Sequence, residues 1–221
     1  MNNNNLQEKV LSHLLSSGFG YEDTIREIDL AKIFGVSVTP VREALNNLEE
    51  KGFVERRKRK GTYLKSFSFK EINEMYDLRS VLEGLAARLL CGVVTPGIIR
   101  KLKGLIEEYE RNKPGRKHNV LSDIDYRFHS LIVESCKNER LVGLVKNFHV
   151  ITKTLKGAKS GEYIREIAFK NPFTHLKILE AIEKSDAEQA ENIAKKHVEW
   201  AKENTIKMML AEGVDVLEMG K

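Results

Sequence analysis

Apolar residues recur along this chain at helical spacing, and the breaks between them divide it near residue 67. Before this point, three short stretches repeat apolar residues every three or four positions, and an extended stretch containing a glycine follows them. After it, the helical spacing continues in seven stretches. The pattern predicts a mainly α protein with a small domain at residues 1–66 and an all-α antiparallel bundle of about seven helices at residues 67–221.

Capping residues mark the helix starts in the second part. Residues 68–71 and 185–188 are predicted capping boxes, in which a serine and a glutamate satisfy helix N–H groups reciprocally. The Thr-Pro pair at 95–96 and the Asn-Pro pair at 171–172 predict two more starts, because proline suits the first helical position. A short helix ending at residue 170 is also expected.

The first helix of the bundle is expected to start at residue 69 and to end at Gly92. Arg79 lies beside its apolar stripe, where the guanidinium either binds a ligand carboxylate or pairs with Glu83, four residues further on. The stripe expected to face the core consists of Met75, Leu78, Leu82, Leu85 and Leu89.

A proline near the start of an amphipathic stretch stands out in the N-terminal part. Thr39 and Pro40 predict a cap and a first helical residue, since the N–H that proline lacks has no partner in the first turn. The helix is expected to end at Gly52. Its predicted buried stripe is Val41, Ala44, Leu45 and Leu48.

Another face of this helix carries Arg42 and Asn46, four positions apart. A short helix precedes it and closes at Gly35, with the small Ala31 suited to a close crossing. This arrangement is typical of a helix-turn-helix, whose second helix enters the DNA major groove. Two ordinary helices of a small domain would show the same spacing.

A run of five basic residues follows. Such a run is usually a solvated surface, but apolar residues at 53–54 and 62–64 flank it and predict the tip of a β-hairpin. A basic hairpin directly after a helix-turn-helix is suited to contact DNA phosphates as a wing. The run consists of Arg56, Arg57, Lys58, Arg59 and Lys60.

Composition and charge indicate where in the cell the protein is located. The net charge is +5, with 41% hydrophobic and 31% charged residues, as in ordinary soluble proteins. No apolar run reaches the roughly 18 residues of a membrane span, and the polar start lacks the regions of a signal peptide. Cys91 and Cys136 lie in apolar segments without metal-ligand spacing, which favours buried thiols in a reducing cytoplasm. A cytoplasmic protein is therefore expected.

Histidines are the candidate chemistry of the helical part. Asp125 and His129 lie side by side, four positions apart, while His175 and His197 fall among apolar neighbours at helical spacing. A single inward histidine is usually a hydrogen-bonded core residue. Burying all four groups unpaired is costly, however, and a metal ion would give each a partner. Spacing alone leaves both interpretations open.

The motif S-x-T-P-V-R-E-A-L at residues 37–45, followed by E-K-G-F-V at 50–54, resembles the GntR family of bacterial transcription regulators. Many members carry arginine at the positions of Ile28 and Val38, so we expect a different operator sequence, with Arg26 compensating for Ile28. The resemblance implies operator contacts from Ser37, Thr39, Arg42, Lys60 and Gly61.

The bundle resembles the FCD effector domain of the FadR-type GntR subgroup. The stretches that carry this resemblance are D-Y-R-F-H-S-L-I-V-E-S-C-K-N at 125–138, H-L-K-I-L-E-A-I at 175–182, K-K-H at 195–197 and L-R-S-V-L-E-G-L-A-A-R-L at 78–89. Metal-containing members use one aspartate and three histidines. The resemblance therefore implies one divalent ion, zinc, nickel or manganese, held by Asp125, His129, His175 and His197.

These features predict a sequence-specific DNA-binding regulator, a repressor, rather than an enzyme. A homodimer on a palindromic operator is expected, because one short recognition helix reads few bases. Four protein ligands on an ion that accepts six leave room for a small carboxylate or hydroxy acid as effector, with Arg79 as its clamp. A metal-sensing regulator is the alternative. A metal-dependent hydrolase is less favoured, since these motifs offer no general base.

Overall fold

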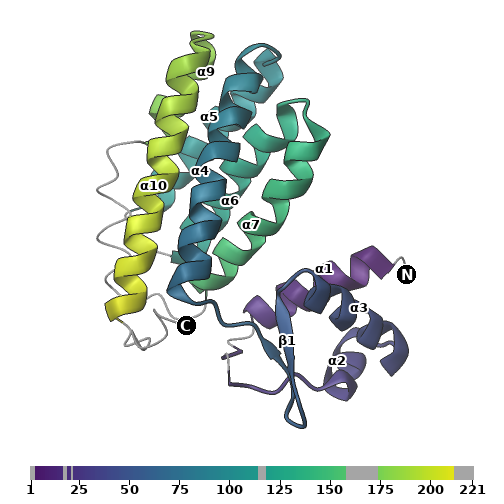
Figure 1. Ribbon diagram of the computed structural model, residues 1–221. Coiled ribbons are helices and arrows are strands. Elements are labelled where there is room, and N and C mark those ends of the chain that lie inside the picture. The colour runs from purple at the N-terminus through teal and green to yellow at the C-terminus, as the bar shows by residue number, and fades with distance from the viewer. Residues whose placement is uncertain (1–2, 17–18, 21, 114–117, 158–173, 212–221) are drawn as a thin grey trace. The chain divides into compact units, whose positions relative to one another are not determined.

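The computed structural model describes residues 3–16, 19–20, 22–113, 118–157 and 174–211. The chain forms two compact units, Met1–Phe67 and Ser68–Lys221. In the first unit, three helices precede a two-stranded antiparallel sheet (Figure 1). Its elements are α1 (Asn3–Ser16), α2 (Glu27–Phe34), α3 (Val38–Glu50), β1 (Val54–Arg57) and β2 (Gly61–Leu64).

Helix α3 has the predicted buried stripe but not the predicted start. It begins at Val38 with Ser37 as its N-cap residue, so the cap at Thr39 and the first position at Pro40 were wrong by two residues. Proline is tolerated here because none of the first four N–H groups has a partner within the helix. The four stripe residues Val41, Ala44, Leu45 and Leu48 are buried as predicted.

The predicted hairpin is present, and a glycine shapes its base. Strands β1 and β2 pair in a register that sets Arg57 opposite Gly61. Gly61 has a φ of 117°, and a Cβ built on it would lie 2.9 Å from a methyl carbon of Thr24. Glycine is therefore required there for both conformation and space. The basic run ends β1 and continues through the turn, as the sequence predicted.

The second unit consists of helices throughout its described residues. They are α4 (Phe69–Cys91), α5 (Pro96–Asn112), α6 (His118–Ser135), α7 (Glu139–Gly157), α9 (His175–Glu183) and α10 (Ala187–Ala211). The long helix α10 packs along α4, as Figure 1 shows. The predicted short helix ending at residue 170 and the predicted cap at 171–172 lie outside the described residues.

One predicted capping box is present and the other is not. At the start of α4, the Ser68 side chain accepts a hydrogen bond from the N–H of Glu71, whose carboxylate accepts one from Ser68 in return. At α10 the cap is Asp186, whose Oδ1 accepts from the N–H of Gln189 at 3.1 Å. Ser185 has a φ of 56° and ends α9, so it cannot also begin α10.

The main core lies between the six described helices of the second unit. Phe128, Ile178 and Leu179 are among its most deeply buried side chains, and the cysteines Cys91 and Cys136 are both buried within it. On α6, Leu121, Ile124, Phe128 and Ile132 form one buried apolar face. This core holds α6, α9 and α10 side by side, which places the histidines.

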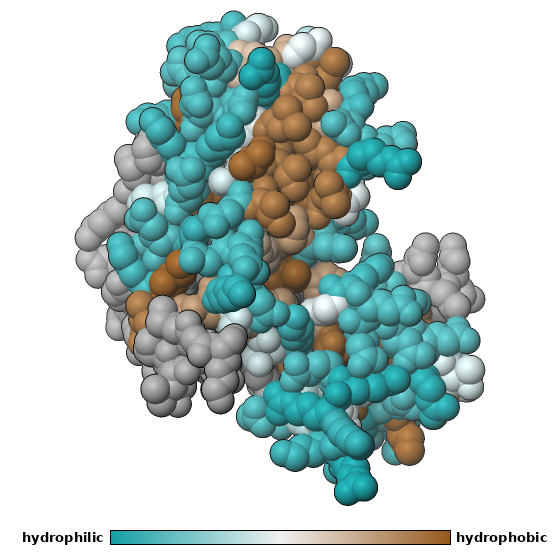
Figure 2. All heavy atoms as spheres, in the orientation of Figure 1, coloured by the Kyte–Doolittle hydropathy of each residue, from teal (hydrophilic) through white to brown (hydrophobic). Residues whose placement is uncertain are grey.

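Helix α4 does not bury the leucine stripe that the sequence predicted. Met75 is buried, but Leu78 is 55% exposed in the single chain and Leu82, Leu85 and Leu89 are only half-buried. The polar residues Arg79 and Glu83 are buried instead. The space-filling view shows a continuous apolar patch over α4 and α7 (Figure 2). The physical reason is that the inward face of α4 contributes to a polar site.

Candidate metal centre and DNA-binding surface

The four predicted metal ligands come from three helices. Asp125 and His129 project side by side from α6, while His197 comes from the middle of α10. His175 is the first residue of α9, where the hydroxyl of Thr174 accepts a hydrogen bond from the helix and fixes its start. The structure brings all four side chains together, although 46 and 68 residues separate His129 from the other two histidines.

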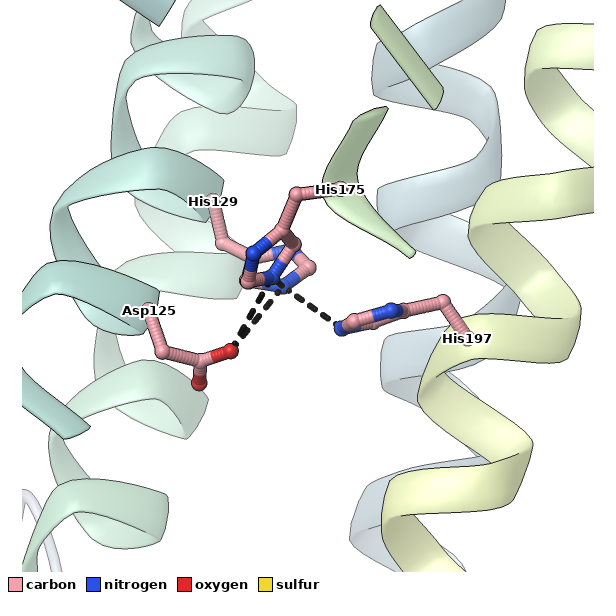
Figure 3. A group of neighbouring side chains, drawn as sticks. All are labelled: Asp125, His129, His175 and His197. Carbon is pink, nitrogen blue, oxygen red and sulfur yellow. Dashed lines mark hydrogen bonds and ion pairs between the residues drawn. The ribbon is translucent and has the colours of Figure 1, made fainter. Parts of the chain in front are cut away.

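One nitrogen from each imidazole and one carboxylate oxygen converge on a single point (Figure 3). The Nε2 atom of His129 lies 3.0 Å from Nε2 of His197 and 3.3 Å from Nε2 of His175. His175 Nε2 lies 3.1 Å from Asp125 Oδ1. All four potential ligand atoms lie within 4.8 Å of one another.

These separations fit a coordinated ion. Metal–nitrogen bonds of about 2.0–2.1 Å place neighbouring ligand atoms about 3.4 Å apart at tetrahedral angles and about 2.9 Å apart at right angles. Three of the separations, 3.0, 3.1 and 3.3 Å, fall between these values, whereas the 3.7 Å between His129 Nε2 and Asp125 Oδ1 is wider. Three imidazole nitrogens this close would repel one another wherever two lone pairs face each other. The donor set therefore suits a divalent metal.

A buried carboxylate lies behind the cluster. Glu83 of α4 is 3% exposed, and its Oε2 lies 2.9 Å from Nδ1 of His129. Its Oε1 lies 2.8 Å from Nε of Arg79 and 3.0 Å from Nε2 of His149. Burial alone would raise the pKa of Glu83, but Arg79, His149 and His129 together lower that pKa well below its usual range.

A small polar cavity opens beside the cluster on the side of α4, α6 and α7. Its cavity volume is about 20 Å³, room for about one water molecule, and it is partly open to solvent. Two of the predicted metal ligands, Asp125 and His129, face it. The remaining lining residues are Arg79, Ser122, Tyr126, His149 and Thr152.

The structure contains the Arg79–Glu83 pair that the sequence offered as an alternative role for Arg79. The guanidinium Nε donates to Glu83 at 2.8 Å, and Nη1 donates to the hydroxyl of Thr152 at 2.7 Å. Arg79 nevertheless lines the cavity. A guanidinium has five N–H donors, so pairing with Glu83 and binding a second anion are compatible.

Sequence reasoning missed most of the cavity wall. The sequence indicated Glu83 only as a possible partner of Arg79, and it indicated no role for His149. Because α7 reaches the cluster through packing against α4 and α6, no local pattern around His149 could have indicated this. The missed lining residues are Ser122, Tyr126, His149 and Thr152.

The predicted DNA-contacting residues on the helices are accessible in the first unit. Arg26, Ser37 and Thr39 are exposed at the starts of α2 and α3. Arg42 is exposed as well, and it forms a two-pronged ion pair with Glu27, at 2.8 and 3.0 Å. This pair holds the start of α2 against the exposed face of α3.

The basic residues of the hairpin fall into two groups. Lys58, Arg59 and Lys60 are exposed in the turn, next to Gly61. Arg57 instead pairs with Glu22 and Glu55 and stacks on a tyrosine ring. Arg56 and Asn46 bind each other at the base of the hairpin. The turn is therefore the most accessible cationic part of this unit.

Two family models match the chain. The FCD domain matches residues 74–199, and the bacterial regulatory proteins of the gntR family match residues 2–64. The first match alone covers more than half of the chain. The chain thus belongs to the GntR regulators that carry an FCD domain.

Individual relatives agree with this membership. The chain is 28% identical over 193 residues to the uncharacterised HTH-type transcriptional regulator YdhC of Bacillus subtilis, covering 86% of this chain and 84% of that protein. It is also 28% identical over 174 residues to a probable D-xylose utilization operon transcriptional repressor of Paenarthrobacter nicotinovorans, covering 79% and 75%. The structure of McbR/YncC from Escherichia coli has the same fold, with a TM-score of 0.79 at 18% identity over 93% of this chain and 97% of that one.

The chain is a DNA-binding transcriptional regulator of the GntR family and not an enzyme, as the sequence predicted. Its N-terminal unit is the winged helix-turn-helix, and its C-terminal unit is the helical FCD domain. Among the described helices, none combines the length and the apolar composition that a bilayer span requires.

Proposed function

We propose that this protein is a cytoplasmic, homodimeric repressor whose operator affinity is controlled by a small hydroxy acid bound at a divalent metal. The observation that carries the proposal is the position of the cavity. Asp125 and His129 belong to the four-residue cluster and also line the cavity, so an ion held by the cluster would expose its remaining coordination positions to a ligand there.

The cavity lining favours a hydrophilic acid. Hydroxyl groups of Ser122, Tyr126 and Thr152 can hydrogen-bond to ligand hydroxyls, and the Arg79 guanidinium can pair with a carboxylate. The cavity volume is about 20 Å³ in this structure, so a bound acid would have to be compact and would displace some of the lining side chains. A relative named as a D-xylose utilization repressor is compatible with a ligand from carbohydrate metabolism.

The ion is zinc, nickel or manganese, because imidazole and carboxylate suit all three. A metal-sensing regulator is the alternative function, in which the ion itself is the signal. The lined cavity favours the effector model, since a pure metal sensor needs no polar pocket beside its ligands.

Operator contacts are proposed for both elements of the first unit. The N-terminal part of α3 would enter the major groove and read bases through Ser37, Thr39, Arg42 and Asn46, with Arg26 alongside. The wing, residues 56–61, would contact phosphates, mainly through its exposed turn. Two copies of this surface would match a palindromic operator.

The homodimer is proposed to form through the apolar face of α4 and α7. Leu78 and Val81 are 55% and 56% exposed on α4, and Leu144 is 58% exposed on α7. Leu82 and Leu85 of α4 are half-buried, and Figure 2 shows an apolar patch over the same two helices. Contiguous apolar patches on soluble proteins mark interaction sites. In a two-fold symmetric dimer, this face of each copy would be buried against the same face of the other copy.

The proposed function is tested by measuring operator binding with and without chelator, each in the presence and in the absence of a hydroxy acid. Purified protein is analysed for bound metal, and its operator affinity is measured with and without chelator while hydroxy acids such as gluconate are titrated in. We expect release of the operator by an acid only when metal is present. An equal response from metal-free protein would make the ion structural, and release by metal alone would identify a metal sensor.

A further inference from the structure

Glu83 is the buried residue around which the metal cluster and the cavity are organised. It comes from α4, whereas the four predicted ligands come from α6, α9 and α10. Its two oxygens face three nitrogen-bearing side chains at 2.8–3.0 Å: Arg79, His129 and His149. One of these is a predicted metal ligand, and the other two line the cavity.

The contact with His129 determines what that imidazole can offer to an ion. A neutral imidazole carries one proton, on either Nδ1 or Nε2. Glu83 Oε2 has no aligned hydrogen bond among the described residues, and Nδ1 of His129 lies 2.9 Å from it. Leaving a buried carboxylate oxygen without a donor is costly, because the group has lost its water without gaining a hydrogen bond. The proton is therefore favoured on Nδ1, which leaves a lone pair on Nε2 at the cluster.

The other oxygen of Glu83 holds the cavity wall. Oε1 accepts a hydrogen bond from Arg79 and lies 3.0 Å from Nε2 of His149, another buried atom without an aligned partner in the described part of the chain. The negative charge of Glu83 thus compensates the buried guanidinium. It also keeps both side chains at the edge of the space next to Asp125 and His129.

We infer that Glu83 is a positioning residue that orients His129 for metal binding and at the same time holds Arg79 and His149 in the effector cavity. The inference rests on the proposed function for the role of the cavity, but its first half concerns only residues of this chain. A hydrogen-bonding partner behind a metal-bound histidine raises ligand basicity and fixes ring orientation, and its loss typically weakens metal binding tenfold to a hundredfold.

The variant Glu83→Gln removes the charge with almost no change of shape. Its matched control is Glu74→Gln on the same helix, where the native side chain is exposed and pairs only loosely with Lys70 at 3.9 Å. Zinc affinity of the full chain is measured by competition with a chromophoric chelator. We expect Glu83→Gln to bind zinc tenfold to a hundredfold more weakly and Glu74→Gln to match the wild type. Equal affinity in all three proteins would overturn the inference.

A spectroscopic readout separates orientation from general structural damage. Nitrogen-15 NMR of metal-free protein at about pH 8, where imidazole is neutral, reports which ring nitrogen of His129 carries the proton. We expect Nδ1–H in the wild type and an increased share of Nε2–H in Glu83→Gln. A wild type with mainly Nε2–H contradicts the inference. If the wild type binds none of zinc, nickel and manganese, the proposed function fails, while this measurement still decides the role of Glu83.

Circular dichroism establishes whether the metal-free variant is folded. Should Glu83→Gln fail to fold, Glu83→Asp retains the charge and withdraws it by one methylene. We then expect weaker zinc binding in Glu83→Asp, because the shorter side chain no longer reaches both imidazoles. Unchanged zinc affinity in that variant would overturn the inference in the same way.

Discussion

Helices α3 and α4 both have apolar residues at helical spacing, but only α4 buries a charged pair beside its apolar residues. In α3 the apolar stripe is fully buried, and the polar Arg42 is exposed where DNA is expected. In α4 the predicted stripe runs from the buried Met75 through the exposed Leu78 to three half-buried leucines, while Arg79 and Glu83 are 5% and 3% exposed. One helix thus buries what its pattern predicts, whereas the other does not.

This difference indicates that the burial of a charged pair is not explained by its contribution to folding stability. A buried ion pair often contributes no more than hydrophobic residues of similar volume would, because desolvation offsets the attraction. Arg79 and Glu83 contact the metal cluster and the cavity, which gives their burial a functional reason. The displaced leucine stripe is left available for a second copy of the chain.

The largest expected effect is the loss of metal binding when two of the four predicted ligands are removed. Replacing His175 and His197 together with alanine should abolish stoichiometric metal binding, because only two of the four ligands remain. Elemental analysis of zinc-loaded, buffer-exchanged protein measures this. His13→Ala, on α1 of the other unit, should retain the ion. Full metal content in the double variant would refute the ligand assignment.

The sequence was sufficient where local pattern decides the structure. The apolar stripe of α3 and the glycines at residues 35, 52 and 61, all with positive φ, predicted the helices and the hairpin of the first unit. The four residues that cluster in the second unit were also singled out, since histidine is conspicuous and Asp125 lies one helical turn from His129. The start of α3 was placed two residues late because several first-turn positions accept proline.

The rest could not be predicted because it depends on contacts between distant elements. The packing of α4 against α6, α7 and α10 determines which of its faces points inward. A leucine stripe in the sequence does not show whether it packs inside one chain or against a second copy. His149 lies 3.0 Å from Glu83, although the two residues are 66 positions apart in the sequence (149 − 83). Tertiary packing therefore overrode amphipathic pattern at the proposed effector site.

Matched leucine substitutions sharpen the comparison of the two helices. Leu45→Ala on α3 should destabilise the protein by about 2–5 kcal/mol, since the side chain is fully buried. Leu78→Ala on α4 should change monomer stability by less than about 0.5 kcal/mol but weaken dimerisation. Chemical denaturation of dilute protein and sedimentation velocity over a range of concentrations measure the two effects. Equal destabilisation by both substitutions would mean that the leucine face is buried within one chain.

Smaller effects are expected on the exposed polar face of α3 and on the wing. Arg42→Ala should lower operator affinity by about 1–3 kcal/mol and relax sequence preference, because a base contact is lost. Lys58→Ala and Lys60→Ala should each weaken binding to all sequences and reduce the salt slope by about one. Anisotropy with operator and scrambled duplexes at several salt concentrations distinguishes them, with the exposed Lys101→Ala of α5 as control. Altered thermal stability without altered DNA binding would exclude this surface.

The smallest effect at neutral pH, and the most specific to the polar face of α4, is the acid sensitivity that Glu83 confers. Its neighbours hold the pKa of Glu83 well below the ordinary 4.5, so ionised Glu83 stabilises the folded state above that pH. As pH falls below about 4.5, the unfolded chain takes up a proton first, and this stabilisation is lost towards the folded-state pKa. The difference in unfolding free energy between wild type and Glu83→Gln should therefore be constant above about pH 5 and shrink below it. Urea titrations of metal-free protein measure that difference, with the exposed Glu74→Gln as the control. A gap that widened on acidification would mean that Glu83 is protonated in the folded protein, and the buried face of α4 would then carry no carboxylate to orient His129.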